Sequence, residues 1–269
     1  MAATSPFGLL AGGGELPRAI ALGARAAGRE VFVVALDQAG DWTNDFPHDR
    51  SSMGRVGHTL RLLRAHGCKE LVFAGYVARP NFFKLRYDLK GLSWFPPVLW
   101  GMRKGDNTLL DVMVGLFERE GLKVISVADI APWLQIPIGP LGTVAPTPRD
   151  DSDIAIAMAH ARKQGARDIG QAVIVRGGEI LAVEKHSGTD AMLTALPKQN
   201  HAGILAKALK PQQTGKTDLP TIGVATVEKA AAAGLAGIAI EANTALVLDK
   251  AAVAAAADAR GLFVTAVAP

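Results

Sequence analysis

The sequence has 269 residues, 49% of them hydrophobic and 20% charged, so a sizeable core is expected and bulk disorder is not. Its net charge of +4 suits an anionic ligand or lipid surface but, without a dense Lys/Arg block, does not indicate nucleic acid. One cysteine, Cys68, excludes an internal disulfide framework and a cysteine metal cage. The first basic side chain is Arg18, and no apolar run reaches the roughly 18–20 residues that span a bilayer. We therefore predict a soluble or peripheral protein without a secretory signal.

The first half of the chain alternates apolar runs with amphipathic segments. Strands are predicted at Phe7–Ala11, Val31–Leu36, Glu70–Val77 and Lys123–Val127, and helices at Arg18–Ala27, Thr59–Ala65 and Thr108–Glu120. This alternation indicates right-handed βαβ units and a parallel sheet. We predict an α/β fold in which residues 1–131 form a Rossmann-like domain.

Prolines then crowd together at Pro132, Pro137, Pro140, Pro146 and Pro148. Each proline removes an amide donor and disfavours helix in the residue before it. Residues 132–149 are therefore predicted to be a Pro-rich linker.

The second half mixes a hairpin with βα units. Helices are predicted at Ser152–Gln164, Thr226–Ala233 and Ala251–Ala259, and strands at Gly203–Leu209, Ala236–Ile240 and Leu262–Val267. Ala172–Val175 and Ile180–Val183 flank Gly177-Gly178, which is typical of a hairpin. We predict a second α/β domain over residues 150–269, with Ser152 or Asp150 capping its first helix.

The first chemical signal is Gly12-Gly13-Gly14, between a predicted strand and a predicted helix. Glycines allow backbone amides to approach a phosphate, and a helix N-terminus favours an anion. The spacing matches neither the dinucleotide fingerprint nor a P-loop, so a tight turn is the alternative.

Further candidates follow the third predicted strand. Gly75 and Arg79 lie near its carboxyl end, where open α/β sheets bind ligands, and Arg79 is suited to clamp a phosphate. Lys104 is a possible phosphate partner and Asp106 a possible substrate or metal contact, although Asp106, Asn107 and Thr108 could equally cap the next helix.

The segment from Phe82 to Lys104 combines six aromatic with five basic residues. Such a mixture suits a membrane interface or an apolar, anionic ligand; the alternative is a satellite core with solvated charges. The paired Pro96-Pro97 argues against one long helix here.

Two polar segments mark the second half. Gly188-Thr189-Asp190 follows the hairpin, and a loop from Lys210 to Gly223 contains Lys216 and Asp218. Simple helix capping and an ordinary exposed connection are the alternatives. The histidines lack zinc-site spacing, and no G-x-S-x-G elbow is present. From the residues alone, the sequence indicates a phosphate-handling α/β protein.

The three glycines, the Gly188–Asp190 element and the Lys210–Thr226 segment together resemble the LpxI family. The resemblance covers nearly the whole chain. It implies Mg²⁺-dependent hydrolysis of the diphosphate of UDP-2,3-diacylglucosamine to UMP and lipid X, in the lipid A synthesis of Gram-negative bacteria. It also implies two domains with the substrate between them, and residence on the cytoplasmic face of the inner membrane. A homodimer is left open.

The late loop departs from the family pattern. The family has approximately Gln-Asp-x-Arg-x-Asp-x-Pro where this sequence has Thr214 and Lys216 in place of the first acid and the arginine. The family pattern Pro-x-Ile-Gly-x-Asp-Thr has an aspartate where this sequence has Ala225.

The resemblance implies a catalytic role for Gln213, Asp218 and position 225, and metal binding by Asp190, Asp218 and position 225. Alanine can neither bind a metal nor act as a base, so we predict an inactivated chain that retains substrate. Two alternatives stay open: another nucleotide-binding Rossmann-type enzyme, such as an oxidoreductase, and a non-catalytic nucleotide-lipid binder.

Overall fold

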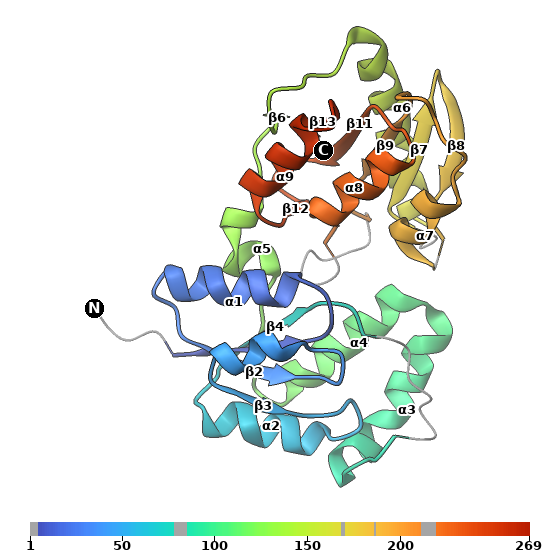
Figure 1. The fold of residues 1–269 in the computed structure, drawn as a ribbon. Helices are drawn as coiled ribbons and strands as arrows, with labels where there is room; N and C mark the ends of the chain where they lie inside the picture. The colour runs from blue at the N-terminus through green and yellow to red at the C-terminus, as the bar shows by residue number, and fades with distance from the viewer. Residues whose placement is uncertain (1–4, 78–84, 168–169, 186, 211–218) are drawn as a thin grey trace. The chain divides into compact units, whose positions relative to one another are not determined.

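The computed structural model describes residues 5–77, 85–167, 170–185, 187–210 and 219–269, with the backbone alone at 106 and 107. The chain divides into two compact units, unit 1 up to Pro132 and unit 2 from Trp133 onward (Figure 1). Each unit contains its own sheet flanked by helices. The predicted fold class, a Rossmann-like parallel-sheet domain followed by a second α/β domain, is confirmed.

Unit 1 is built on a five-stranded sheet of order β3-β2-β1-β4-β5, in which every pairing is parallel. The strands are β1 (Phe7–Ala11), β2 (Val31–Ala35), β3 (His48–Arg50), β4 (Glu70–Ala74) and β5 (Lys123–Val124). The chain extends the sheet from β1 outward to β3 and then returns to β4 on the other side of β1. This reversal puts a topological switch point at the carboxyl ends of β1 and β4.

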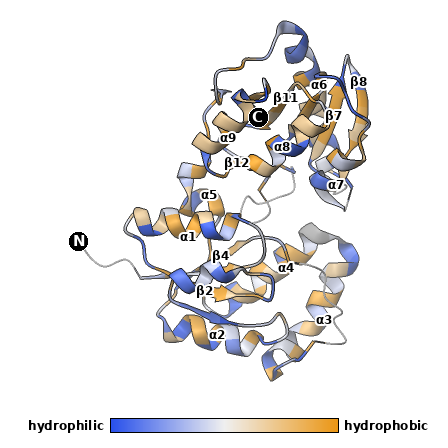
Figure 2. Ribbon diagram, viewed as in Figure 1, coloured by the Kyte–Doolittle hydropathy of each residue, from blue (hydrophilic) through white to orange (hydrophobic). Residues whose placement is uncertain are grey.

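Helices cover both faces of the unit 1 sheet (Figure 1). They are α1 (Leu16–Ala26), α2 (Val56–Ala65), α3 (Leu89–Lys104), α4 (Asp106–Arg119) and α5 (Val127–Ile130), with a 3-10 turn at Asp41–Asp45. Helices α2, α3 and α4 share one apolar cluster with the strands, and α1 and α5 contact each other. Because both faces are covered, β2 is buried along its whole length, and Figure 2 shows it as hydrophobic.

Unit 2 contains a mixed sheet of order β6-β13-β11-β9-β7-β8 and a separate two-stranded parallel sheet, β10-β12. The strands are β6 (Gly139–Pro140), β7 (Ala172–Arg176), β8 (Glu179–Val183), β9 (Ile204–Lys207), β10 (Thr221–Ile222), β11 (Gly237–Glu241), β12 (Leu246–Val247) and β13 (Phe263–Val267). Strands β9, β11 and β13 are parallel, whereas β7 and β8 form the predicted hairpin across Gly177-Gly178.

Four helices enclose this sheet: α6 (Pro148–Gly165), α7 (Gly188–Ala195), α8 (Val224–Ala232) and α9 (Lys250–Asp258). Helix α6 packs into one apolar cluster, and α7, α8 and α9 contribute to the other. The sheet is therefore enclosed on both faces, as in unit 1.

The expectation that Pro96-Pro97 would prevent one long helix is wrong, because α3 continues through both prolines. A proline at position i removes the hydrogen bond to the carbonyl of residue i−4. The two carbonyls concerned belong to Leu92 and Ser93, which are exposed, so water can solvate them.

Local capping also differs from expectation. Helix α6 begins at Pro148 and is capped by Thr147, whose hydroxyl accepts from the Asp150 amide in a capping box, rather than by Ser152 or Asp150. Part of the segment predicted as linker joins the second sheet, because β6 pairs antiparallel with β13. Helix α4 has Gly105 as its N-cap, with φ of 125°, so Asp106 begins the helix instead of capping it.

Candidate functional site

The switch point of unit 1 brings together two segments singled out in the sequence. Gly12-Gly13-Gly14 follows β1, and Gly75 and Tyr76 follow β4. The Gly13 amide donates to the Tyr76 carbonyl at 2.8 Å, and the Tyr76 amide donates back to Gly13 at 3.0 Å. The two loops therefore form one backbone-bonded unit.

Close approach explains why these positions are glycine. A Cβ at Gly75 would lie 2.5 Å from the Gly13 carbonyl oxygen, and the φ of 86° at Gly75 is strained for other residues. A Cβ at Gly12 would collide with the Tyr76 carbonyl. The Gly12 amide also donates to Ala74, at 2.9 Å. The expectation that Gly12 and Gly13 offer open amides to a phosphate is thus wrong, because both amides already serve the backbone.

Helix α1 begins directly after this glycine turn. Its N-cap residue is Glu15, whose side chain makes no capping hydrogen bond within the described residues, and no acid stands in its first turn. The acidic side chain of Glu15 nevertheless lies at the positive end of the helix dipole. Tyr76 lies against Gly13 and Gly14 with its side chain 65% exposed. The turn therefore presents a helix N-terminus, with the acidic Glu15 at its cap, and a flat aromatic surface.

For the other candidate residues of unit 1, the structure gives positions in the fold rather than contacts. Lys104 is exposed at the last position of α3, and Asp106 begins α4 one residue after Gly105. Arg79 lies outside the described residues. The sequence neighbours Lys104 and Asp106 thus stand at the junction of two helices.

In unit 2, Gly188, Thr189 and Asp190 form the first turn of α7. The Thr189 hydroxyl donates to Glu184 at 2.7 Å, and Glu184 is buried and also accepts from the Gln171 amide at 2.8 Å. This carboxylate therefore fixes the start of α7 to the end of β8. Asp190 is exposed and forms an ion pair with Lys229 of α8.

Ala225 lies in the first turn of α8, directly beyond β10, and its side chain is exposed. Lys229 is one helical turn further along, and residues four apart share a helix face. Asp190 pairs with Lys229, so the structure links the first turn of α7 to α8 one helical turn beyond Ala225.

Two buried charged residues, Lys207 and Glu241, lie at the carboxyl ends of β9 and β11. Neither was predicted from the sequence. Lys207 ends β9 and donates to the Thr221 carbonyl at 3.0 Å. Glu241 ends β11, where it accepts from the Leu209 amide at 2.8 Å and pairs with Arg162 at 3.1 Å. A charged residue that ends an apolar strand, as in Ile204–Lys207, was the available signal.

Lys210 follows β9 and is buried, with Gly165 packed closely against it. The Glu241 bond to the Leu209 amide holds the backbone just before it. Gln213, Lys216 and Asp218 lie outside the described residues. Of the candidate residues of this loop, the structure therefore describes only Lys210.

The comparison with known families covers both units. The LpxI N-terminal domain matches residues 6–134, and the LpxI C-terminal domain matches residues 137–265. The chain is also 44% identical over 273 residues to the UDP-2,3-diacylglucosamine pyrophosphatase LpxI of Caulobacter vibrioides, with 98% of each chain covered. This chain belongs to the LpxI family. The resemblance inferred from the glycine turn and the late loop is thereby confirmed.

The family resemblance implies metal binding by Asp190, Asp218 and position 225, and the structure describes Asp190 and position 225. Within the described ranges, no group of three or more His, Cys, Asp or Glu side chains is placed to hold a metal. Asp190 is already ion-paired, and position 225 offers only a methyl group. The described part of this LpxI chain thus does not by itself fit a magnesium centre.

Two further observations concern the Cys68 thiol and the helices of this LpxI chain. Burial raises the pKa of the Cys68 thiol to about 11, so it is protonated and unsuited to nucleophilic attack at neutral pH. None of the helices in the described residues has the length and hydrophobicity needed to cross a bilayer.

Proposed function

We propose that this chain is a UDP-2,3-diacylglucosamine pyrophosphohydrolase of lipid A synthesis whose hydrolytic step is disabled by Ala225. The substrate assignment is supported by the identity of 44% to a pyrophosphatase named for this substrate, across 98% of both chains. The disablement is supported by the exposed alanine at position 225 in the first turn of α8, where the family pattern has an aspartate.

Hydrolysis of the diphosphate requires a proton acceptor, and a carboxylate at position 225 would be one. A water oxygen bonds to one phosphorus of the diphosphate, the bridging P–O bond breaks, and UMP and lipid X are released. The proton that the water loses needs an acceptor, and general bases typically contribute about 10²–10⁴-fold to a rate. Because alanine accepts no proton, substrate can bind to such a chain without being cleaved efficiently.

Residues predicted to bind the substrate occur in each unit. In unit 1 the predicted diphosphate contacts are the glycine turn at the N-terminus of α1, Gly75, Arg79 and Lys104, and Asp106 is a predicted substrate or metal contact. In unit 2 they are Lys210, Lys216 and the Gly188–Asp190 turn. Cations and a helix N-terminus both stabilise the concentrated negative charge of a diphosphate.

Magnesium dependence is part of the proposal. Mg²⁺ takes oxygen ligands, and when bound it would neutralise the charge on the diphosphate. Since the described residues do not complete such a site, it would need Asp218 and an acid at position 225 in addition to Asp190.

The direct test compares the unchanged chain with Ala225→Asp and with Ala225→Asn as an uncharged control. UMP release from detergent-dispersed UDP-2,3-diacylglucosamine is measured with and without Mg²⁺. We expect Ala225→Asp to raise Mg²⁺-dependent hydrolysis on the order of 10²–10⁴-fold. The variant should fold, because an aspartate in the first turn of a helix is favourable. Equal rates in all three chains would remove position 225 from the reaction.

Ala225 also favours a second candidate, a non-catalytic nucleotide-lipid binder. Under that reading, Ala225→Asp would bind the substrate and still release no UMP. Mass analysis of lipids that co-purify with the unchanged chain separates the cases further. Intact UDP-2,3-diacylglucosamine supports a chain that retains substrate, whereas lipid X would indicate turnover.

The substrate's two acyl chains anchor it in a bilayer, so we infer that the chain works at the cytoplasmic face of the inner membrane as a peripheral protein.

A further inference from the structure

One face of α3 leaves large apolar side chains in solvent. Leu89, Leu92 and Trp100 are 90%, 59% and 56% exposed, and Pro96 between them is also exposed. These positions are three or four residues apart, so they form one stripe along the helix, which we name the α3 stripe. Figure 2 shows hydrophobic residues along α3.

The opposite face of α3 is fixed in place by packing. A Cβ at Gly91 would collide with the Gly54 carbonyl, and Gly101 lies against the backbone of Leu109 in α4. The buried Trp94 ring packs edge-on against Phe117, with centroids 5.0 Å apart. Helix α3 therefore cannot roll to bury its stripe without losing these contacts.

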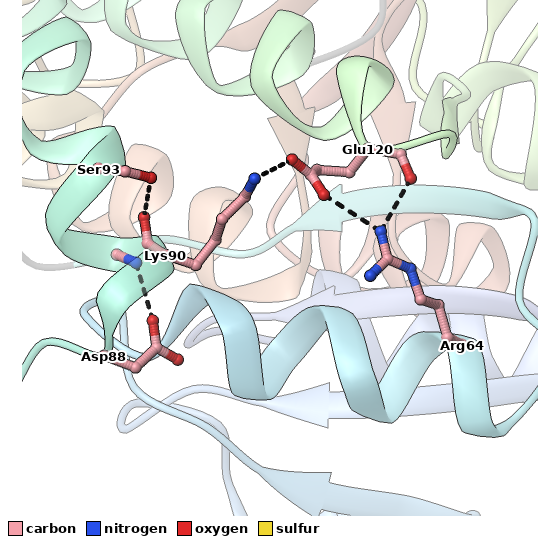
Figure 3. A network of polar contacts seen from close by, with 6 residues as sticks. Arg64, Asp88, Lys90, Ser93 and Glu120 are labelled. Atoms are coloured by element: carbon pink, nitrogen blue, oxygen red, sulfur yellow. Dashed lines mark hydrogen bonds and ion pairs between the residues drawn. The ribbon is translucent and has the colours of Figure 1, made fainter.

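Polar contacts fix the start of α3 as well (Figure 3). Asp88 caps the helix by accepting from the Gly91 amide at 2.8 Å and also accepts from the His58 amide of α2 at 2.9 Å. Lys90 pairs with Glu120, which Arg64 of α2 also contacts at 3.1 Å. The stripe is thus presented by a helix that is held from two neighbouring elements.

The charge along α3 has one sign. Residues 89–104 contain Lys90, Arg103 and Lys104 and no acidic residue, and Arg103 and Lys104 are exposed at the end of the stripe. An apolar hollow of about 420 Å³ adjoins Trp100 between α3 and α4, lined in part by Pro97, Val112 and Leu116. An apolar stripe with an exposed tryptophan and terminal cations is typical of helices that lie in a membrane interface.

We propose that the α3 stripe is a docking surface for an anionic phospholipid bilayer. Leu89, Leu92 and Trp100 enter the boundary between headgroups and acyl chains, and Arg103 lies at the lipid phosphates. A second copy of the chain fits this face less well, because the same stripe offers no acidic side chain of residues 89–104 to meet Arg103. The surface gives a physical basis to the peripheral location proposed above, on which the inference rests.

The experiment is co-sedimentation of the full chain with vesicles that contain no substrate. Phosphatidylglycerol-containing vesicles are compared with pure phosphatidylcholine vesicles, at low and high salt. Leu92→Glu and Trp100→Glu remove apolar contact at positions that are more than half exposed, so folding is retained. Ile180→Glu, at a side chain 42% exposed on β8, is the matched control.

We expect the unchanged chain to sediment with the anionic vesicles, and binding to fall with salt. Each α3 variant should lower the partition coefficient at least roughly tenfold, whereas Ile180→Glu should change it less than about twofold. Equal sedimentation of the α3 variants and the control would overturn the proposal. So would equal binding to neutral vesicles, or a dimer in ultracentrifugation that the α3 variants dissociate.

The outcome is independent of the hydrolytic proposal. Vesicle binding needs no turnover, and UMP release by Ala225→Asp is measured on detergent-dispersed substrate. Failure of one assay therefore leaves the other interpretable.

Discussion

The glycine turn of unit 1 and the α7–α8 region of unit 2 are built in opposite ways. The turn is held by backbone hydrogen bonds and by close approach at glycines, with Gly13 and Tyr76 bonded to each other in both directions. The α7–α8 region is held by side chains, including the hydrogen bond of the Thr189 hydroxyl to Glu184 and the Asp190–Lys229 ion pair. A single side-chain substitution in the α7–α8 region is therefore expected to change local contacts, whereas an added side chain in the turn disturbs its backbone.

The largest effect on stability is expected where the backbone construction of the turn is broken. Gly75→Ala adds a Cβ 2.5 Å from the Gly13 oxygen at a φ of 86°, and we expect it to lower the free energy of unfolding by about 2–4 kcal/mol. Urea denaturation measures the loss.

The control Gly28→Ala separates the cost of backbone strain from the cost of steric overlap in this measurement. Gly28 has a φ of 73°, and no atom of the described residues lies within 4 Å of the point that a Cβ would occupy there. Only backbone strain of about 1–2 kcal/mol therefore applies. Losses of the same size at both positions would show that close approach does not hold the turn.

A smaller effect is expected where a side-chain contact of unit 2 is weakened. Glu241→Gln keeps an acceptor for the Leu209 amide but removes the charge that pairs with Arg162, so we expect a loss of about 1–3 kcal/mol. Glu228→Gln is the control, because its pair with Arg260 is exposed and should be worth less than about 1 kcal/mol. The comparison fails if both variants unfold at the same urea concentration.

The smallest effect concerns Asp88, an ionised side chain that anchors α3 in unit 1. Burial alone would raise the pKa of Asp88, but hydrogen bonds from the Gly91, Gly57 and His58 amides and the charge of Arg61 lower it below its ordinary value. A lowered pKa in the folded state stabilises the protein above the unfolded pKa of about 3.9, and this contribution is lost as pH falls through the folded value.

Asp88→Ser should therefore cost about 1 kcal/mol or less near neutral pH, because serine still caps the helix but carries no charge. The difference from the unchanged chain should vanish in strongly acidic solution, as measured by denaturation over a pH series. A difference that is constant with pH would mean that ionisation of Asp88 does not stabilise the start of α3.

The sequence by itself determined the α/β class and the longer strands of both sheets, whereas short strands such as β3 and β6 were not predicted. Val31–Ala35 and Phe7–Ala11 are apolar without interruption, which only strands buried on both faces need, and the Gly177-Gly178 turn set the hairpin. The glycine turn, the Gly188–Asp190 element and the late loop together indicated the family, and the late loop singled out Ala225. Motif residues adjacent in sequence can be read without knowledge of tertiary contacts.

Only the tertiary structure decided how distant side chains are used. The Gly12 and Gly13 amides are occupied by residues more than sixty positions away in the chain, and Glu241 meets Arg162 and Leu209 only through the order of the strands. The proline pair in α3 was misjudged for the same reason. Whether water reaches the carbonyls of Leu92 and Ser93 depends on which face of α3 packs against α2 and α4, and local sequence does not encode that choice.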